Sequence, residues 1–126
     1  MAKSEKQKLK LLYIIQCLME KTDEEHAVTT QEIIDYLALQ GITAERKSIY
    51  TDIDLLIDFG MDIIKKPGRS GGYTLASRQF ELAELKLLVD AVQSSKFITT
   101  KKSRELIGKL ETLCSKYEAT QLHRQV

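Results

Sequence analysis

Basic and hydroxyl side chains cluster at positions 46–51 of the chain, and their types could contact DNA. The cluster consists of Arg46, Lys47, Ser48, Tyr50 and Thr51. A guanidinium or ammonium group pairs with phosphate, and an arginine can donate two hydrogen bonds to a guanine in the major groove. Hydroxyl groups bind phosphates and base edges. These residues can therefore bind double-stranded DNA if one element presents them together.

A helix over residues 45–58 is expected to present this cluster. Apolar residues at helical spacing would form one buried stripe, made of Ile49, Ile53, Leu56 and Ile57. The basic and hydroxyl residues lie at or near the start of the helix, away from that stripe. Such a helix start can enter a major groove. Alternatively, these residues form a helix face that only contacts solvent. The segments before and after the helix help to decide between the two interpretations.

The segment before this helix predicts the first helix of a helix-turn-helix. Thr29 and Glu32 have the spacing of a capping box, and apolar residues follow at Ile33, Ile34 and Leu37. This helix would end near Gln40, with Gly41 as its stop. Free N–H groups at a helix start favour a phosphate. The candidate contacts in this turn are Thr29, Thr30 and Gln31, although Thr29 could also serve as a cap.

A β-hairpin is expected after Gly60. Residues 61–66 are β-prone, residues 67–72 hold the only proline and three of the six glycines, and residues 73–75 return as a second strand. This hairpin would be the wing of a winged helix-turn-helix. Its cations are candidate contacts to the DNA backbone or the minor groove: Lys65, Lys66 and Arg69. A solvated turn arginine is an equal alternative for Arg69.

Residues 77–126 are expected to form a helical segment for dimerisation. One helix would span about 82–96, and a second about 101–118 would carry an apolar seam made of Leu106, Leu110, Leu113 and Tyr117. A seam this short needs a partner, which is a second copy or the winged domain itself. The predicted fold is mainly α (α+β). It has a winged helix-turn-helix with a two-stranded hairpin over 1–76 and a C-terminal pair of helices over 77–126.

Several function classes find no support in the sequence. A hydrophobic content of 43% and a charged content of 29% are typical of a soluble globular protein. The first residues lack the apolar stretch of a secretory signal, and Cys17 and Cys114 sit in helical patterns, so we expect reduced thiols and a cytoplasmic location. Asp52 and Asp54 have no partner base, and no residues have metal-ligand spacing. We therefore expect no enzyme activity, cofactor, membrane segment or small-molecule site.

The charge distribution restricts DNA binding to local patches. Residues 1–76 hold 10 lysines and arginines against 12 acidic residues, a net charge of −2, whereas residues 77–126 carry +3. An N-terminal basic arm adds one more possible patch, with Lys3, Lys6, Lys8 and Lys10. An alternative to DNA binding is that the protein is a protein-interaction and oligomerisation module on a winged-helix scaffold. The net negative charge of residues 1–76 is the main argument for this alternative.

The chain resembles the N-terminal half of WYL-domain-containing transcriptional regulators, which carry a DeoR-like winged helix-turn-helix. The resemblance covers about residues 8–97 and rests on segments 31–34, 46–53, 59–60, 71–73 and 80–92. It implies a bacterial, cytoplasmic, sequence-specific DNA-binding regulator, usually a dimer. Thr51 stands where the family often has arginine before the aspartate. Arg46, Lys47 and Tyr50 therefore become the more important candidates for DNA contact. No WYL domain follows before Val126, so we expect either a piece of a longer protein or a stand-alone module.

Overall fold

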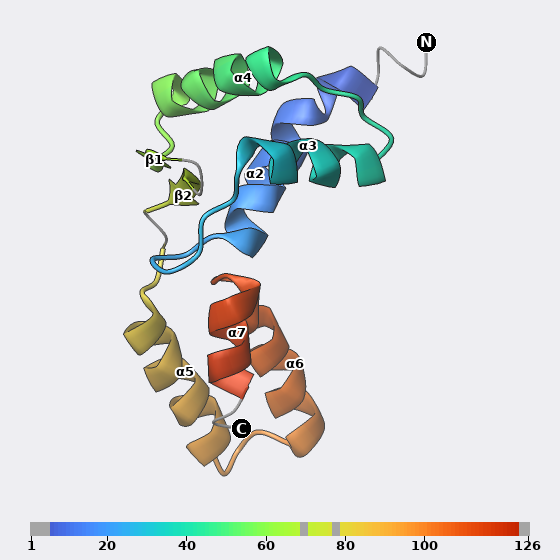
Figure 1. The fold of residues 1–126 in the computed structure, drawn as a ribbon. Coiled ribbons are helices and arrows are strands. Elements are labelled where there is room, and N and C mark those ends of the chain that lie inside the picture. Colours follow the sequence, from blue (N-terminus) through green and yellow to red (C-terminus); the bar gives the residue numbers. More distant parts are fainter. Residues whose placement is uncertain (1–5, 69–70, 77–78, 124–126) are drawn as a thin grey trace. The chain divides into compact units, whose positions relative to one another are not determined.

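The computed structural model describes residues 6–68, 71–76 and 79–123 (Figure 1). It divides into two compact units, Met1–Ser77 and Arg78–Val126, and each unit is considered by itself below. The elements of the first unit are α2 (Lys10–Lys21), α3 (Thr30–Leu39), α4 (Arg46–Phe59), β1 (Ile63–Lys66) and β2 (Gly72–Leu75). Those of the second are α5 (Leu82–Ser94), α6 (Thr100–Glu111) and α7 (Lys116–His123). The predicted winged helix-turn-helix with C-terminal helices is confirmed.

Three helices enclose the core of the first unit. The expected stripe of α4 is buried at Ile49, Ile53 and Leu56, and it packs with apolar residues of α2 and α3. Ile57 is 37% exposed, so its place in that stripe was predicted wrongly. It lies at the edge of the stripe, one position beyond Leu56. None of the helices in the described ranges has the length and apolar character needed to cross a bilayer.

The start of α3 has the predicted capping box. The Thr29 hydroxyl accepts a hydrogen bond from the Glu32 N–H at 3.1 Å, and the Glu32 carboxylate accepts one from the Thr29 N–H at 3.0 Å. The helix ends at Leu39, and Gly41 follows with a φ of 79°, a backbone conformation that suits glycine. The turn that leads into α4 is therefore short, as a helix-turn-helix requires.

The wing is an antiparallel hairpin that is anchored at its second strand. β1 and β2 pair from Ile63 opposite Leu75 to Lys66 opposite Gly72. On its other edge, Tyr73 exchanges two backbone hydrogen bonds with Val28, at 3.0 and 2.8 Å. A β-carbon on Gly72 would lie only 2.2 Å from the Val28 carbonyl oxygen, so this close approach requires glycine. The hairpin is thereby fixed to the residue just before the α3 cap.

The second unit has three helices within the described residues, where the sequence predicted a pair. The single helix expected over 101–118 is wrong, because α6 ends at Glu111 and α7 begins at Lys116. The Thr112 hydroxyl donates to the Lys109 carbonyl at 2.6 Å, and the Ser115 hydroxyl accepts from the Glu118 N–H at 3.1 Å. These side-chain hydrogen bonds end one helix and cap the next. The core of this unit contains Leu85, Val89, Ile107, Cys114 and Leu122.

Candidate nucleic-acid interface

The first turns of α4 present most of the predicted cluster to solvent. Arg46, Lys47, Tyr50 and Thr51 are all exposed, whereas Ser48 is half-buried. Tyr50 is 46% exposed although it is large and aromatic. The four exposed side chains lie within two turns of the helix start, where free backbone N–H groups also favour an anion. This end of α4 can therefore offer cations, hydroxyl groups and an aromatic ring to a nucleic acid.

A partly buried ion pair ties this helix to α2. The Lys10 ammonium lies 2.8 Å from the Asp52 carboxylate and donates a hydrogen bond to the Ser48 hydroxyl at 2.8 Å. The side chains of Lys10 and Asp52 are only 12% and 15% exposed. Asp52 thus has a cationic partner on another helix, 42 positions away in the sequence. The placement of Lys10 in a DNA-binding arm is wrong, because its charge is used inside the protein to position α4.

Breaking this ion pair should loosen the candidate interface. We expect Lys10→Met to lower the free energy of unfolding by about 1–3 kcal/mol, because it leaves the Asp52 carboxylate partly buried without its cation. Urea denaturation would measure the loss. The double variant Lys10→Met/Asp52→Leu should be more stable than Lys10→Met alone, since no unpaired charge remains. If the double variant instead loses as much free energy of unfolding as the two single variants combined, the two side chains do not stabilise the protein as a pair.

Fewer side chains at the start of α3 are available for DNA contact than the sequence predicted. The Thr30 side chain is buried, and its hydroxyl lies 3.2 Å from the Tyr73 hydroxyl, so it joins α3 to β2 and does not face solvent. The Thr29 hydroxyl is used as the helix cap. Gln31 is exposed and donates to Asp35 at 2.9 Å. Of the three candidates in this turn, Gln31 is thus the side chain that a phosphate could reach most directly.

The wing presents two exposed lysines, one of which has an acidic partner. The Lys65 ammonium lies 2.6 Å from the Asp54 carboxylate of α4, and their side chains are 55% and 64% exposed. The hydrogen bond from Lys65 to Asp54 raises the pKa of that lysine. Lys66 is exposed. The third wing candidate, Arg69, lies outside the described residues. The wing and α4 are therefore linked by opposite charges at the surface.

Sequence reasoning missed three of these contacts, each of which joins distant parts of the chain. They are Lys10 with Asp52, Thr30 with Tyr73, and Lys65 with Asp54. No local pattern could have found the first two, because 42 and 43 positions separate the partners. The third had a weak signal, since a hairpin directly after a helix brings its first strand close to that helix.

The buried titratable groups are poorly suited to chemistry. Burial raises the pKa of the Cys17 thiol to about 11, which keeps it protonated and unreactive near neutral pH. Burial, and then the charge of Glu20, raise the pKa of Tyr36 to about 12. Within the described ranges, no three His, Cys, Asp or Glu side chains lie close enough together to hold a metal ion. The exposed start of α4 is therefore the site with the clearest binding chemistry.

One of three comparisons with known proteins finds a related family. Residues 12–68 match the family model described as FokI, D3 domain. That family is a DNA-binding winged-helix-like domain. The matched segment includes α2, α3, α4 and β1, and it covers less than half of the 126 residues. Comparison with curated proteins and with solved structures gives no match. No comparison links the chain to WYL-domain regulators, so that resemblance stays a prediction.

Proposed function

We propose that the protein binds a specific double-stranded DNA sequence as a dimeric transcriptional regulator, with α4 in the major groove. The observation that carries the proposal is the exposed set of Arg46, Lys47, Tyr50 and Thr51 on the second helix of a helix-turn-helix. The matched residues 12–68 contain that helix and resemble a DNA-binding domain. A helix in this position reads base edges with the residues of its first turns.

The other elements would hold α4 on the DNA. Gln31, at the start of α3, is exposed beside free N–H groups that can bind a backbone phosphate. Lys65 and Lys66 would contact the backbone or the adjacent minor groove from the wing. Base contacts then supply the specificity, whereas the lysines supply affinity that does not depend on sequence. The regulatory role follows from the resemblance to WYL-domain regulators, and no catalysis is required for it.

Selection from a random library of duplex DNA tests this function directly. We expect one enriched motif, bound at least about 10³-fold more tightly than random duplex at physiological salt. Fluorescence anisotropy at several salt concentrations would measure both affinities. A library that shows no enrichment would overturn sequence-specific recognition. Binding that is strong but equal for all sequences would reduce the function to non-specific DNA binding.

The wing lysines should control the salt dependence of binding. Replacing Lys65 and Lys66 by glutamine should flatten the plot of log K against log salt by about 0.9 for each phosphate contact that is lost. The preference for the selected site should change little, because phosphates carry no sequence information. The matched control is Lys96→Gln/Lys101→Gln, which removes two exposed lysines from the second unit. An unchanged slope in the wing variant would show that the wing does not touch DNA.

A second candidate function rests on the other end of α4. Leu55 and Phe59 are 52% and 84% exposed, and the nearby acidic residues Asp58 and Asp62 are also exposed. An apolar and acidic surface of this kind would repel phosphate and could dock a basic protein. It favours the alternative of a protein-interaction module on a winged-helix scaffold. Phe59→Ala should leave DNA binding unchanged if the two surfaces act separately.

A further inference from the structure

Thr51 is an exposed residue of α4 that points away from the core of the first unit. The buried stripe of this helix consists of Ile49, Ile53 and Leu56. Because an α-helix turns by about 100° for each residue, Thr51 lies about 200° from Ile49 around the helix axis, almost opposite the centre of that stripe. It also falls within the first two turns of α4. A side chain in this position faces the base edges if α4 lies in a major groove.

The hydroxyl group of Thr51 is already used within the helix. It donates a hydrogen bond to the Lys47 carbonyl oxygen, one turn earlier, at 3.1 Å. Phosphate oxygens only accept hydrogen bonds, so this hydroxyl can donate to a phosphate only if it gives up the bond to Lys47. The bond also holds the side chain in one rotamer, because a β-branched residue is stiff about its first side-chain torsion. The methyl group is therefore the part of Thr51 that is left for a partner.

The hydroxyl group of Ser48 is turned inward. It donates to the Glu45 carbonyl oxygen at 2.8 Å and accepts a hydrogen bond from the Lys10 ammonium group, also at 2.8 Å. The Ser48 side chain is half-buried, and it helps to join α4 to α2, although the sequence predicted it as a DNA contact. The exposed part of the cluster thus offers DNA two cations, an aromatic ring and the methyl group of Thr51.

We propose that Thr51 selects a thymine in the DNA target, with its methyl group packed against the C5-methyl group of the base. Thymine is the one standard base that presents a methyl group in the major groove, and threonine is among the side chains that contact it there. A methyl group held in one rotamer loses little conformational freedom on binding. This inference rests on the proposed function, since it names one base of the sequence that α4 would read.

The residues around Thr51 suit such a contact. Lys47 and Tyr50 are both exposed, so a cation and an aromatic ring lie on the same part of the helix surface. Asp54 follows one turn after Thr51, and its carboxylate would repel the DNA backbone if it stood alone. It lies 2.6 Å from the Lys65 ammonium group of the wing, which offsets much of that repulsion. The helix can therefore approach base edges at Thr51.

Two substitutions at Thr51 separate the role of the methyl group from that of the hydroxyl group. Thr51→Val keeps a methyl group there, so it should bind the DNA motif selected from the random library within about twofold of the original protein. Thr51→Ser keeps the hydroxyl group and removes the methyl group, so it should bind about 3- to 10-fold more weakly. Thr120→Ser is the matched control, because Thr120 is exposed on α7 and donates the same kind of hydrogen bond, to the Lys116 carbonyl at 3.0 Å. Circular dichroism would show that each variant is folded.

Deoxyuridine in the DNA tests the same contact from the other side, because it lacks only the C5-methyl group of thymine and keeps its base pairing. We expect one thymine of the selected motif at which this replacement weakens binding of the original protein and of Thr51→Val by about 3- to 10-fold. At that position Thr51→Ser should respond by less than about twofold, since the two methyl groups act as a pair. Fluorescence anisotropy would measure each affinity. A purely structural role of Thr51 would not depend on a methyl group of the DNA.

Several results would overturn the thymine contact. They are a selected motif without a fixed thymine, a motif that tolerates deoxyuridine at every position, and Thr51→Ser that binds as tightly as the original protein or responds to deoxyuridine as strongly. Weaker binding by Thr51→Val would assign the contact to the hydroxyl group and would overturn it as well. In all these cases an enriched motif still exists, so the proposed function stands. A library without enrichment would instead overturn both.

Discussion

Replacing Arg46 and Tyr50 together by alanine should remove most of the preference for the selected DNA site. We expect a loss of about 2–4 kcal/mol in specific binding, or roughly 30- to 1000-fold in affinity, with little change on random duplex. The two side chains lie one helical turn apart at the exposed start of α4, so they reach adjacent base pairs. Neither belongs to the buried core, so the fold should persist.

Competition between the selected site and random duplex would measure this loss. Asp58→Ala is the matched control, because Asp58 is an exposed residue on the last turn of the same helix. Arg46→Ala alone should account for about 1–3 kcal/mol if its guanidinium group reads a guanine. A double variant that binds the selected site as tightly as the original protein would remove α4 from the major groove.

A chain cut after Ser77 should stay folded, become monomeric and lose most of its affinity for a palindromic site. The first unit has its own core, with residues from α2, α3, α4, β1 and β2, so it does not need the second unit for burial of its apolar side chains. A dimer binds two half-sites at once, and the second contact raises the effective affinity by about 10²-fold or more. Affinity for a single half-site should change little.

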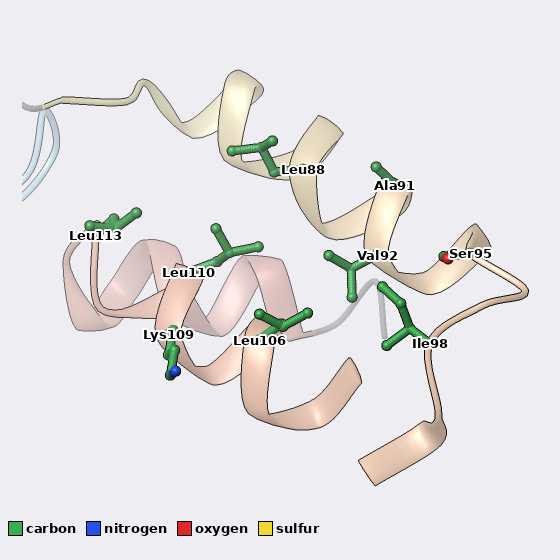
Figure 2. Close-up of a pocket in the computed structure, with 9 residues that line it drawn as sticks. All are labelled: Leu88, Ala91, Val92, Ser95, Ile98, Leu106, Lys109, Leu110 and Leu113. Carbon is green, nitrogen blue, oxygen red and sulfur yellow. The ribbon is translucent and has the colours of Figure 1, made fainter. Parts of the chain in front are cut away.

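Circular dichroism, sedimentation and binding to both kinds of site would separate the possible outcomes for the shortened chain. Leu110→Asp in the full chain should mimic the cut, because it places a charge in the apolar groove between α5 and α6 of the second unit (Figure 2). Leu106 and Leu113 of the predicted seam also line this groove, whereas Tyr117 lies on α7. Palindrome binding that stays within about threefold after the cut would place dimerisation elsewhere in the protein. An unfolded fragment would contradict the independence of the first unit.

Local signals in the sequence predicted much of the first unit. The spacing of Thr29 and Glu32 predicted the start of α3, and the apolar period of Ile49 and Ile53 predicted the buried face of α4. Glycines around residues 67–72 predicted the wing. In each case the responsible interactions lie within a few residues of one another, so the pattern can be read directly from the chain. The exposed cluster on α4 followed from the same period.

Contacts between distant residues could not be predicted in this way. Lys10 was expected to face DNA, because nothing near it in the sequence shows that Asp52 is its partner. Thr30 was expected on the surface for the same reason. The break between α6 and α7 was missed because the apolar spacing continues through Leu113, while Ser115 caps a new helix. At this point the hydrogen bonds of short polar side chains, and not the spacing of apolar residues, determine where one helix ends and the next begins.

The contact between Lys65 and Asp54 has a consequence for how the protein would find its target in a genome. A phosphate approaching this lysine must compete with a carboxylate already in place, which weakens attraction to arbitrary sequences. A genome offers about 10⁶–10⁹ competing positions, so weak arbitrary binding leaves more molecules free to search. Asp54→Asn should therefore tighten binding to random duplex, which fluorescence anisotropy at low salt would measure. The variant should also take longer to find its target site. One acidic side chain beside the wing would then govern how quickly the target is occupied.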